Sequence, residues 1–568
     1  MIVHSTATQW APHPRRDPAR AVDLARALDA PLAAAHVLVN RGFGDPGAAG
    51  RFLHPDLEDL HDPLLLLDLD RAVERIERAL ATGERVFVHG DYDVDGITAT
   101  FLLSSVLQEL GGRVEVFIPN REPDGYGLSP RAVGLARARG CGLVVTVDCG
   151  MTAVAAVQQG RELGIDTIIT DHHEWQPPLP PALAVVNPRR PGCPYPFKDL
   201  SGVGVAFKLA EGLLRRRGMA ERAREYLDVV ALGTIADVVP LVGENRVLAR
   251  LGLERLNRTE RAGLRALMRV SGLSGPSISG GQVAFVLAPR INAAGRMGNA
   301  EQGYRLLTAR DPDEATALAE SLEDDNQRRR RFDERALEQA KALVEAGFPG
   351  SAAILLWSEH WHQGVIGIVA SRLVELFNRP TVLVALAGEH GRGSGRSVEG
   401  VDLSEVLGEC SDLLVAHGGH ALAAGLTVRR ERLPELRERF ERLVAGRLPG
   451  GPRPRPLEID ADLRLAECDR DLAEWIERMA PHGLRNPEPL FGAAGLAVEA
   501  VSVAGQGRHL RLTLRDATGR AEAIGFGLGG QAEAVREAKR CDIAFVPTRN
   551  EWRGEERVQL KVKAVRVP

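Results

Sequence analysis

From about residue 85, short runs of β-branched and apolar residues alternate with longer amphipathic stretches. The apolar runs are RVFVHG, RVEVFIP, GLVVTVDCG and IDTIITDHH, and the stretches between them include ITATFLLSSVLQELGG and TAVAAVQQGRELG. Runs of this length, separated by helix-length segments, are typical of repeated strand–helix–strand units. Such units assemble into a parallel sheet covered by helices. The pattern therefore predicts an α/β domain.

A second α/β set follows a long helical region. Residues 203–270 have a mostly helical pattern, and after Pro312 the charged chain runs to about Ala346 without a further Gly or Pro to break a helix. We expect this stretch to form a long connecting helix. Beyond it, SAAILLWS, GVIGIVASRLVELF and PTVLVALAG repeat the strand–helix–strand pattern. A second α/β domain is therefore predicted.

The last part of the chain has the pattern of a small barrel. After the linker GRLPGGPRPRPLEI, the segments GLAVEAVSV, HLRLTLRDATGRAEAIGF and VQLKVKAVRV alternate apolar with polar or basic residues. Alternation with period two predicts antiparallel strands with one buried and one basic face. Barrels of the OB type use such a face to bind single strands, with aromatic residues for stacking. A solvated charged surface explains the same alternation. Phe526 and Trp552 are stacking candidates, although core packing is the more common role for each residue taken alone.

These patterns divide the chain into five predicted parts. They are an N-terminal segment 1–70 without an interpretable motif, an α/β domain 71–300, connecting helices 301–348, a second α/β domain 349–448 and an OB-like barrel 449–568. The total of 568 residues is too long for one hydrophobic core, which agrees with several domains.

Composition narrows the class of protein. The chain is 44% hydrophobic and 26% charged, with no apolar run of membrane-spanning length and no apolar leader at its start, so we expect a cytoplasmic protein. The six cysteines are scattered singly, without the paired spacing of zinc sites or the density of disulfide scaffolds. A net charge of −4 does not by itself indicate a nucleic-acid binder.

Polar and chargeable residues follow four consecutive predicted strands. They are His89, Asp91, Asp93 and Asp95 after the first, Asn120 and Arg121 after the second, Asp148 after the third, and Asp171, His172 and His173 after the fourth. In an open parallel sheet the carboxyl ends of the strands meet at one edge, where ligands bind. We therefore expect these side chains to converge.

Clustered carboxylates repel each other unless a cation neutralises them. Carboxylate oxygens with one or two imidazoles, and no thiolate pair, favour Mn²⁺ or Mg²⁺. If DYDVDG is extended, its alternation places Asp91, Asp93 and Asp95 on one side. A structural role in turning the loop is the alternative for any single member. Two cations about 4 Å apart suit the hydrolysis of a phosphate ester.

Two further residues extend this cluster. Asp237, in YLDVVALGTIADVVPL, lies in an otherwise apolar run and is either a metal ligand or a helix-cap or salt-bridge acid. His173 is placed to bind the phosphate or carry a proton, or else to orient its neighbour His172.

The motifs DYDVDG, VTVDCG, TDHHE and GTIADVVPL resemble the ordered motifs of the DHH phosphoesterase superfamily. The resemblance implies a parallel-sheet catalytic domain, a second DHH-associated α/β domain and two divalent cations. The metal ligands it implies are Asp93, Asp95, Asp148, His172 and Asp237, with His89 as a further candidate. It also implies that His173 engages the scissile phosphate.

The second α/β domain contains Gly-rich stretches that suit phosphate binding. We interpret GRGSGRS as a loop that exposes backbone N–H groups beside Ser394 and Arg396, with a flexible hairpin as the alternative. We interpret HGGH, which ends at His420, as a tight turn that permits close backbone approach or that surrounds a core histidine. Tyr126 is a candidate for stacking on a base, or a core or turn tyrosine.

Within the superfamily, FIPNREPDGYGLS, PRINAAGRMGNA, WHQGVIGIVASRL and HGGHALAAGLTV resemble the RecJ family of bacterial single-strand-specific exonucleases. The resemblance implies 5′ to 3′ hydrolysis of single-stranded DNA in repair and recombination, by a monomer that works with a single-strand-binding protein and a helicase. It also implies backbone contacts from Arg121, Arg296, Ser394, Arg396 and His420. The alternatives are a DHH enzyme for short oligonucleotides and a non-catalytic scaffold that binds single strands.

Overall fold

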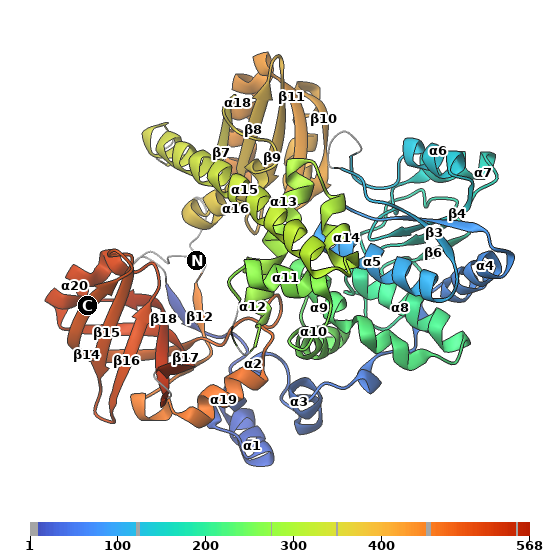
Figure 1. Cartoon of the computed structure of the whole chain (residues 1–568). Coiled ribbons are helices and arrows are strands. Elements are labelled where there is room, and N and C mark those ends of the chain that lie inside the picture. The colour runs from blue at the N-terminus through green and yellow to red at the C-terminus, as the bar shows by residue number, and fades with distance from the viewer. Residues whose placement is uncertain are drawn as a thin grey trace. The chain divides into compact units, whose positions relative to one another are not determined.

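The computed structural model describes residues 9–120, 125–273, 275, 277–347, 350–449, 456–552 and 555–567 (Figure 1). The chain forms two compact units. The first contains Phe43–Asn326 and Glu477–Glu488, and the second contains the chain up to Gly42, Gln327–Ile476 and the residues from Pro489 onward.

The first unit is built on a five-stranded parallel sheet, which confirms the predicted α/β domain. Its strands are β2 (Arg85–His89), β3 (Arg113–Phe117), β4 (Cys141–Val147), β5 (Asp166–Thr170) and β6 (Ala184–Val186), in the spatial order β3-β2-β4-β5-β6. The central strands are apolar on both faces because helices cover both faces.

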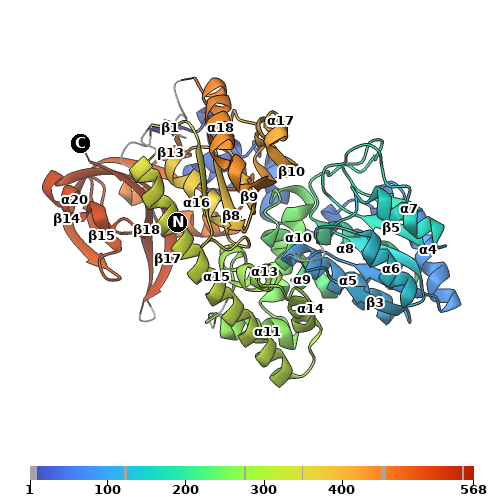
Figure 2. The same cartoon turned by 90° about the horizontal axis from the view of Figure 1, so that it is seen from above.

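Helices lie on both faces of this sheet (Figures 1 and 2), and each face has its own hydrophobic core. One face packs against α4 (Leu69–Thr82), α5 (Val94–Glu109) and α8 (Gly202–Arg216). The other packs against α6 (Pro130–Ala138) and α7 (Val154–Glu162). This arrangement leaves the carboxyl edge of the sheet uncovered by its own helices.

A layer of helices completes the first unit, as predicted for residues 203–270. It contains α3 (Pro46–Leu53), α9 (Leu227–Ala236), α10 (Gly243–Leu256), α11 (Ala262–Val270), α12 (Gly280–Gln282), a π-helix η4 (Val283–Leu287), α13 (Ala288–Met297) and α14 (Glu301–Thr308), together with short turns such as η2 (Pro63–Leu65).

The predicted long helix is α15 (Pro312–Gly347). Its first half contributes Ala315 and Leu322 to the core of the first unit. Its second half contributes Ala336 and Ala340 to a core of the second unit. The apolar side chains of this one helix therefore pack into two different hydrophobic cores.

The second unit contains the second predicted α/β domain, with a five-stranded sheet in the order β10-β11-β9-β8-β7. Its strands are β7 (Ile354–Ser358), β8 (Thr381–Ala387), β9 (His390–Arg396), β10 (Leu414–His420) and β11 (Ala423–Arg429), and only β7 and β8 are parallel. The second half of α15 and α16 (Ile366–Phe377) cover one face, and α17 (Leu403–Gly408) and α18 (Leu433–Arg447) cover the other (Figure 2).

The C-terminal part is a closed five-stranded barrel, which confirms the OB-like prediction (Figure 1). Its strands are β14 (Phe491–Ala504), β15 (His509–Arg515), β16 (Arg520–Gly525), β17 (Arg540–Trp552) and β18 (Glu555–Arg566), and pairing of β14 with β17 closes it. Helix α20 (Ala532–Ala538) connects β16 to β17. The short strand β13 (Ala461–Asp462) and helix α19 (Arg470–Arg478) precede the barrel.

The first part of the predicted N-terminal segment, up to Gly42, packs against the chain that leads into this barrel, whereas residues from Phe43 onward belong to the first unit. Strand β1 (Trp10–Pro12) pairs in parallel with β12 (Leu457–Ile459), and α1 (Pro18–Leu28) and α2 (Leu32–Asn40) follow it. The buried carboxylate of Asp460 accepts hydrogen bonds from Asn40 at 2.9 Å and Arg41 at 2.9 Å. These contacts join the end of the N-terminal helices to the segment that precedes the barrel.

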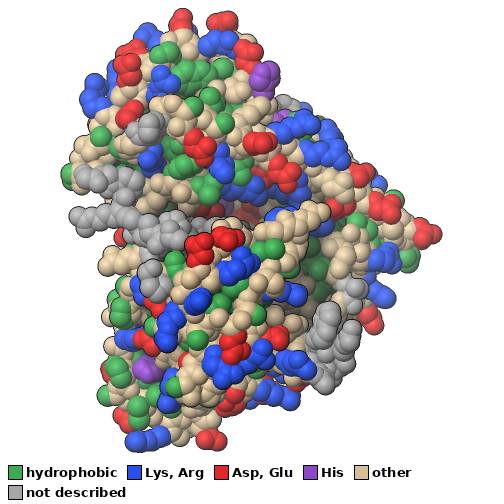
Figure 3. Space-filling view, turned by 90° about the vertical axis from the view of Figure 1, so that its left-hand side faces the viewer, with side chains coloured by type: hydrophobic (Ala, Val, Ile, Leu, Met, Phe, Trp, Pro, Cys, Tyr) green, Lys and Arg blue, Asp and Glu red, His purple; other side chains and the backbone are tan. Residues whose placement is uncertain are grey.

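Acidic and basic side chains are interspersed on the surface, as Figure 3 shows for one face. This mixture accounts for the small net charge of −4. Among the described residues, no helix combines the length and the apolar character needed to cross a membrane.

Candidate metal centre

The predicted site residues lie where the direction of the chain reverses across the sheet. Strand β2 lies between β3 and β4, so its first crossover leads to one side and the next returns to the other. Such a switch point opens a crevice at the carboxyl ends of the two central strands. Asp91 and Asp93 follow β2 at this crevice, and Asp148 follows β4.

The acidic motif after β2 is not extended, so the expected alternation of Asp91, Asp93 and Asp95 along one side is wrong. Helix α5 begins at Val94, and Asp93 is its N-cap, whose side chain accepts a hydrogen bond from the N–H of Gly96 at 3.0 Å. Asp95 therefore lies in the first helical turn. An aspartate is a favoured N-cap because it satisfies an N–H group that the helix leaves unpaired.

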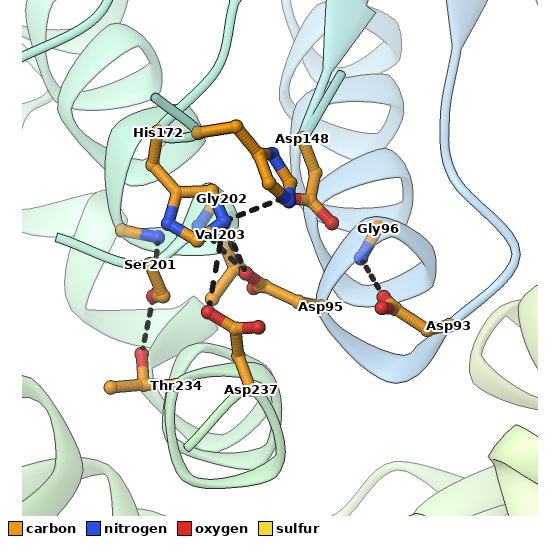
Figure 4. Close-up of polar contacts among 12 residues, drawn as sticks. Asp93, Asp95, Gly96, Asp148, His172, Ser201, Gly202, Val203, Thr234 and Asp237 are labelled. Carbon is orange, nitrogen blue, oxygen red and sulfur yellow. Dashed lines mark hydrogen bonds and ion pairs between the residues drawn. The ribbon is translucent and has the colours of Figure 1, made fainter. Parts of the chain in front are cut away.

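Asp95 is held by the start of another helix (Figure 4). Its two carboxylate oxygens accept hydrogen bonds from the N–H groups of Gly202 at 2.7 Å and Val203 at 2.8 Å, in the first turn of α8. The carboxylate is almost fully buried. The positive end of the helix dipole favours its charged form there.

His172 lies at the centre of the cluster (Figure 4). Its Nε2 atom is 3.1 Å from Asp148 Oδ1, 3.7 Å from Asp237 Oδ2 and 3.9 Å from Asp95 Oδ2. Asp237 is the C-cap of α9, where the helix dipole disfavours a carboxylate. Carboxylates from three separate parts of the fold thus meet around one imidazole nitrogen.

Among the described residues, three overlapping groups each have ligand atoms within 4.8 Å of one another. They are Asp95, His172 and Asp237; Asp148, His172 and His173; and Asp91, Asp93 and Asp148. His172 and Asp148 each belong to two groups, so neighbouring cations would share ligands. The arrangement accommodates two adjacent ions.

The pKa values of these groups are also consistent with a site that binds cations. Burial, followed by the charge of Asp93, raises the pKa of Asp95 to about 7. Burial and neighbouring carboxylates raise the pKa values of Asp91, Asp148 and Asp237 well above their ordinary range. Burial, followed by the charge of His173, lowers the pKa of His172 to about 3, which leaves the imidazole neutral, as a metal ligand must be.

Several buried ligand atoms of the cluster accept or donate no hydrogen bond within the part of the chain that the structure describes. They are Asp91 Oδ1, Asp148 Oδ1, His172 Nε2 and Asp237 Oδ2. Buried polar atoms are normally satisfied. Oxygen ligands with one imidazole are the set that Mn²⁺ and Mg²⁺ bind, so the residues fit the predicted pair of divalent cations.

Asp171 orients the two histidines. It accepts hydrogen bonds from the backbone N–H groups of His172 at 2.7 Å and His173 at 3.0 Å, and its Oδ1 lies 2.8 Å from His173 Nδ1. Burial alone would raise the pKa of Asp171, but these bonds lower it. Burial lowers the pKa of His173, and the contact with Asp171 more than offsets this and raises it.

The remaining predicted residues of this unit lie around the cluster. His89 is fully buried, with its ring 5.5 Å from that of Phe117, and it is outside the three groups, so its role as a ligand stays a prediction. The hydroxyl of Tyr126 lies 3.1 Å from His173 Nδ1. Asn120 accepts a hydrogen bond from the N–H of Ala300. Arg121 lies outside the described residues.

Sequence reasoning missed the support for this loop. The side chain of Asn292, on α13, accepts a hydrogen bond from the N–H of Val94 at 3.0 Å. A Cβ atom at Gly295 would lie 2.6 Å from the carbonyl oxygen of Tyr92, and one at Gly202 would lie 2.2 Å from Asp148 Oδ1. Glycines in the helical stretches GVGVAF and NAAGR were the available signal, because glycine in a helix often permits close approach.

Comparisons with known proteins agree with this geometry. Residues 85–234 match the DHH family N-terminal domain, residues 350–446 the DHHA1 domain and residues 459–564 the RecJ OB domain. The single-stranded-DNA-specific exonuclease RecJ of Dickeya dadantii is 37% identical over 90% of this chain and 92% of its own length. The chain belongs to the RecJ family.

Other RecJ proteins are similar at the same level. RecJ of Bacillus subtilis is 38% identical over 93% of this chain and 67% of its own length. A crystal structure of RecJ from Thermus thermophilus in complex with Mn²⁺ superimposes with a TM-score of 0.84 and 35% identity, over 99% of this chain and 79% of that chain. A structure of exonuclease RecJ bound to manganese matches 69% of this chain and 97% of its own, with a TM-score of 0.61 and 40% identity.

The second α/β domain of this RecJ-family chain presents its polar residues from strands. GRGSGRS forms most of β9 and pairs with β8 and β11, so the predicted loop is wrong and its backbone N–H groups face neighbouring strands. Ser394 and Arg396 instead offer their side chains, which meet Gly367 in the first turn of α16. HGGH ends strand β10 and His420 is exposed, so the alternative of a tight turn around a core histidine is wrong.

The barrel has a groove of about 640 Å³ on the face of β15, β16 and β18. Arg511, Arg520 and Arg557 line it, and no aromatic residue is among the described lining residues. Phe526 packs its ring edge-on against His509, 5.2 Å away. The side chain of Trp552 lies outside the described residues. A stacking role for either residue stays a prediction.

Proposed function

We propose that this protein is a metal-dependent, single-stranded-DNA-specific exonuclease that hydrolyses phosphodiester bonds from 5′ to 3′ in DNA repair and recombination. The observation that carries the proposal is the meeting of Asp95, Asp148, His172 and Asp237 in one buried crevice of a RecJ-family chain. Burying several carboxylates side by side costs free energy, so we expect them to serve a function.

We assign the metal ligands to the acids and imidazoles of the crevice. Two divalent cations, Mn²⁺ or Mg²⁺, are held by Asp93, Asp95, Asp148, His172 and Asp237. His89 is a further ligand. When bound, such a pair activates water and neutralises charge on the phosphoryl group.

His173 engages the scissile phosphate. The contact with Asp171 raises the pKa of His173, so its ring keeps a proton to donate to a phosphate oxygen. Tyr126, whose hydroxyl lies 3.1 Å from Nδ1 of the same ring, is a further substrate contact and stacks on a base.

The remaining substrate contacts hold the DNA backbone. The hydrogen-bond donors to the phosphates are the side chains of Arg121, Arg296, Arg396, Ser394 and His420. The basic groove of the barrel binds a further part of the strand. We therefore expect long single strands to bind more tightly than short oligonucleotides, because they can occupy the basic groove as well.

The enzyme needs a source of single strands. We propose that it works as a cytoplasmic monomer beside a helicase that unwinds duplex DNA and a single-strand-binding protein that covers the product. The requirement follows from the substrate, because an enzyme restricted to single strands depends on another activity to separate a duplex.

The test compares the wild-type chain with Asp148→Ala on 5′-labelled single-stranded DNA, duplex DNA and RNA, with Mn²⁺, Mg²⁺ or chelator. The wild type should release mononucleotides from single-stranded DNA only, and only with metal. The variant should bind the strand but not cut it.

Two outcomes would contradict the proposal. Absence of metal-dependent cutting by the wild type would favour a scaffold that binds single strands. Equal rates on dinucleotides and long strands would favour a DHH phosphodiesterase for short oligonucleotides.

A further inference from the structure

Arg189 joins two segments that lie beside candidate metal ligands. Its side chain pairs with Glu174, directly after His173, at 2.5 Å and with Asp199 at 3.0 Å. Its Nε donates a hydrogen bond to the carbonyl of Lys198 at 3.2 Å. All three nitrogens of the guanidinium group are therefore bonded within the first unit, and the side chain is only 27% exposed.

Asp199 begins the segment that shapes one side of the metal centre (Figure 4). The next residue, Leu200, has a backbone hydrogen bond with His172. The first N–H groups of α8 follow and hold Asp95. The carbonyl of Asp199 itself accepts a hydrogen bond from the side chain of Asn245. A shift of Asp199 would therefore disturb two candidate ligands at once.

A second arginine reaches Asp199 from far along the sequence. Arg485 Nη1 lies 3.2 Å from Asp199 Oδ2, whereas Arg189 contacts Oδ1, so two cations share one carboxylate. Arg485 belongs to residues 477–488, which follow the linker in sequence but lie in the first unit. Guanidinium groups match the geometry of a carboxylate, so Asp199 is held through both of its oxygens.

The turn that carries Arg485 is fixed by its own contacts. The backbone groups of Gly483 and Asn486 bond to each other at 2.8 and 3.1 Å. The buried side chain of Asn486 donates hydrogen bonds to two carbonyls of the same segment. The carbonyl of Leu484 accepts a hydrogen bond from the N–H of Leu241 at 2.9 Å. The guanidinium group is thus presented to Asp199 by an anchored turn.

Four charged residues form one ion network beside the metal centre: Glu174, Arg189, Asp199 and Arg485. Isolated surface ion pairs contribute little, but charges that hold one another in a network contribute more. Burial has the largest effect on the pKa values of His172 and Asp237, and the charge of Arg189 lowers both. The network is therefore close enough to act on the metal centre.

We propose that this ion network positions the metal ligands, and that Arg485 from the C-terminal part of the sequence completes it. The network holds the segment after β5 against the start of α8, so that His172 and Asp95 keep the spacing that the cations need. Removing a group that orients metal ligands typically costs about 10- to 100-fold in metal affinity or activity. The inference rests on the proposed function, because it requires divalent cations in the crevice.

The test measures Mn²⁺ binding to the full-length protein without substrate, from the EPR signal of the free ion. Arg189→Gln should bind Mn²⁺ roughly tenfold more weakly than wild type. Loss of a positive charge alone would strengthen the binding of a cation, so weaker binding reports on geometry. Arg189→Lys keeps the charge but lacks the planar fork, so it should recover only part of the affinity. Arg485→Gln should weaken binding roughly threefold, the scale of an exposed ion pair.

Arg190→Gln is the matched control. Arg190 is the next residue, is buried to a similar extent and pairs with Asp68 before α4, outside the ion network. This variant should lower the melting temperature in chelator and leave the Mn²⁺ affinity unchanged. In an Asp199→Asn background, Arg485→Gln should have little further effect on Mn²⁺ affinity, because its ion pair is already lost.

Three results would overturn the inference. They are a lower melting temperature but normal Mn²⁺ affinity in Arg189→Gln, an equal loss of affinity in Arg190→Gln, and unchanged affinity in Arg485→Gln. The last variant decides even if Arg189→Gln does not fold, because the side chain of Arg485 is 65% exposed. Absence of Mn²⁺ binding by wild type would overturn the inference and the proposed function together. Mn²⁺ binding without degradation of single-stranded DNA would overturn the proposed function alone.

Discussion

The buried acids of the metal centre make the metal-free protein sensitive to pH. Burial, followed by neighbouring carboxylates, raises the pKa of Asp95 to about 7 and the pKa values of Asp148 and Asp237 well above the ordinary value. An acid whose pKa is raised by folding stabilises the fold while protonated, and this contribution is lost as pH rises through the folded pKa. His172, with its pKa lowered to about 3, acts in the opposite sense only below about pH 6.5.

We therefore expect the melting temperature in chelator to fall between pH 6.5 and 8. The expected loss is up to about 1.4 kcal/mol per pH unit for each carboxyl group that is still protonated in the folded protein but ionised in the unfolded chain. Mg²⁺ should remove most of this dependence, because it binds the charged form. Asp148→Asn should melt higher than wild type at pH 8 in chelator, since it removes one buried charge. A melting temperature that rises with pH in chelator would rule out this account.

Single residues were predictable where chemistry follows directly from position in the chain. Asp148 and His172 come directly after apolar strands, so the sheet edge brings them together whatever the details of the loops. The start of α5 was not predictable in this way. An aspartate such as Asp93 is common both as a helix N-cap and in loops, and the motif fits an extended chain equally well. The bond from Val94 to Asn292 joins residues far apart in sequence, and no local pattern specifies it.

At the scale of elements, the start of α8 sets the position of two candidate ligands. Its N–H groups hold Asp95, and Gly202 lies against Asp148, where an added Cβ would be 2.2 Å from Oδ1. We expect Gly202→Ala to displace Asp148 and to lower the cleavage rate by roughly a hundredfold, the scale of loss for a misplacement of about 1 Å.

The measurement pairs cleavage with the rise in melting temperature that Mn²⁺ produces, which should shrink in Gly202→Ala. Gly134→Ala is the matched control, because its Cβ would meet nothing within 4 Å in the middle of α6. There the added methyl group should raise stability by up to about 1 kcal/mol and leave cleavage unchanged. Normal metal stabilisation of Gly202→Ala would contradict the assigned role of α8.

Elements were predictable where local preference and tertiary packing agree. The strands of the first sheet are β-branched runs, and the long helix lacks breakers. Strand β9 was missed because HGRGSGR has low strand preference. Its glycines are required by packing: a Cβ at Gly391 would lie 2.5 Å from Val384, and one at Gly393 would lie 2.7 Å from Leu426. That requirement is visible only once the neighbouring strands are placed.

For the whole molecule, the order of the domains was readable from the sequence and the division into units was not. Residues 477–488 follow the linker in sequence but belong to the first unit. They do so because buried Arg246 donates hydrogen bonds to the carbonyls of Met479 and Arg478 as well as to that of Phe52. Deleting everything after the linker would remove two of these three carbonyl acceptors from a buried cation, so point variants are the better probe of the barrel.

Point variants in the groove of the barrel provide such a probe, because the charge of the groove can be changed without altering the metal centre. Arg511 and Arg557 line it and are exposed. Each phosphate contact that is lost should lower the slope of log affinity against log salt by about one. Arg511→Gln combined with Arg557→Gln should therefore lower this slope by about two on long single strands.

The same double variant should leave dinucleotide cleavage unchanged, since a dinucleotide occupies only the crevice of the first unit. Arg310→Gln combined with Arg536→Gln removes an equal charge away from the groove residues and is the matched control. If the control lowers the slope as much, net charge rather than the groove holds the strand. If neither variant changes it, the strand does not use this face of the barrel.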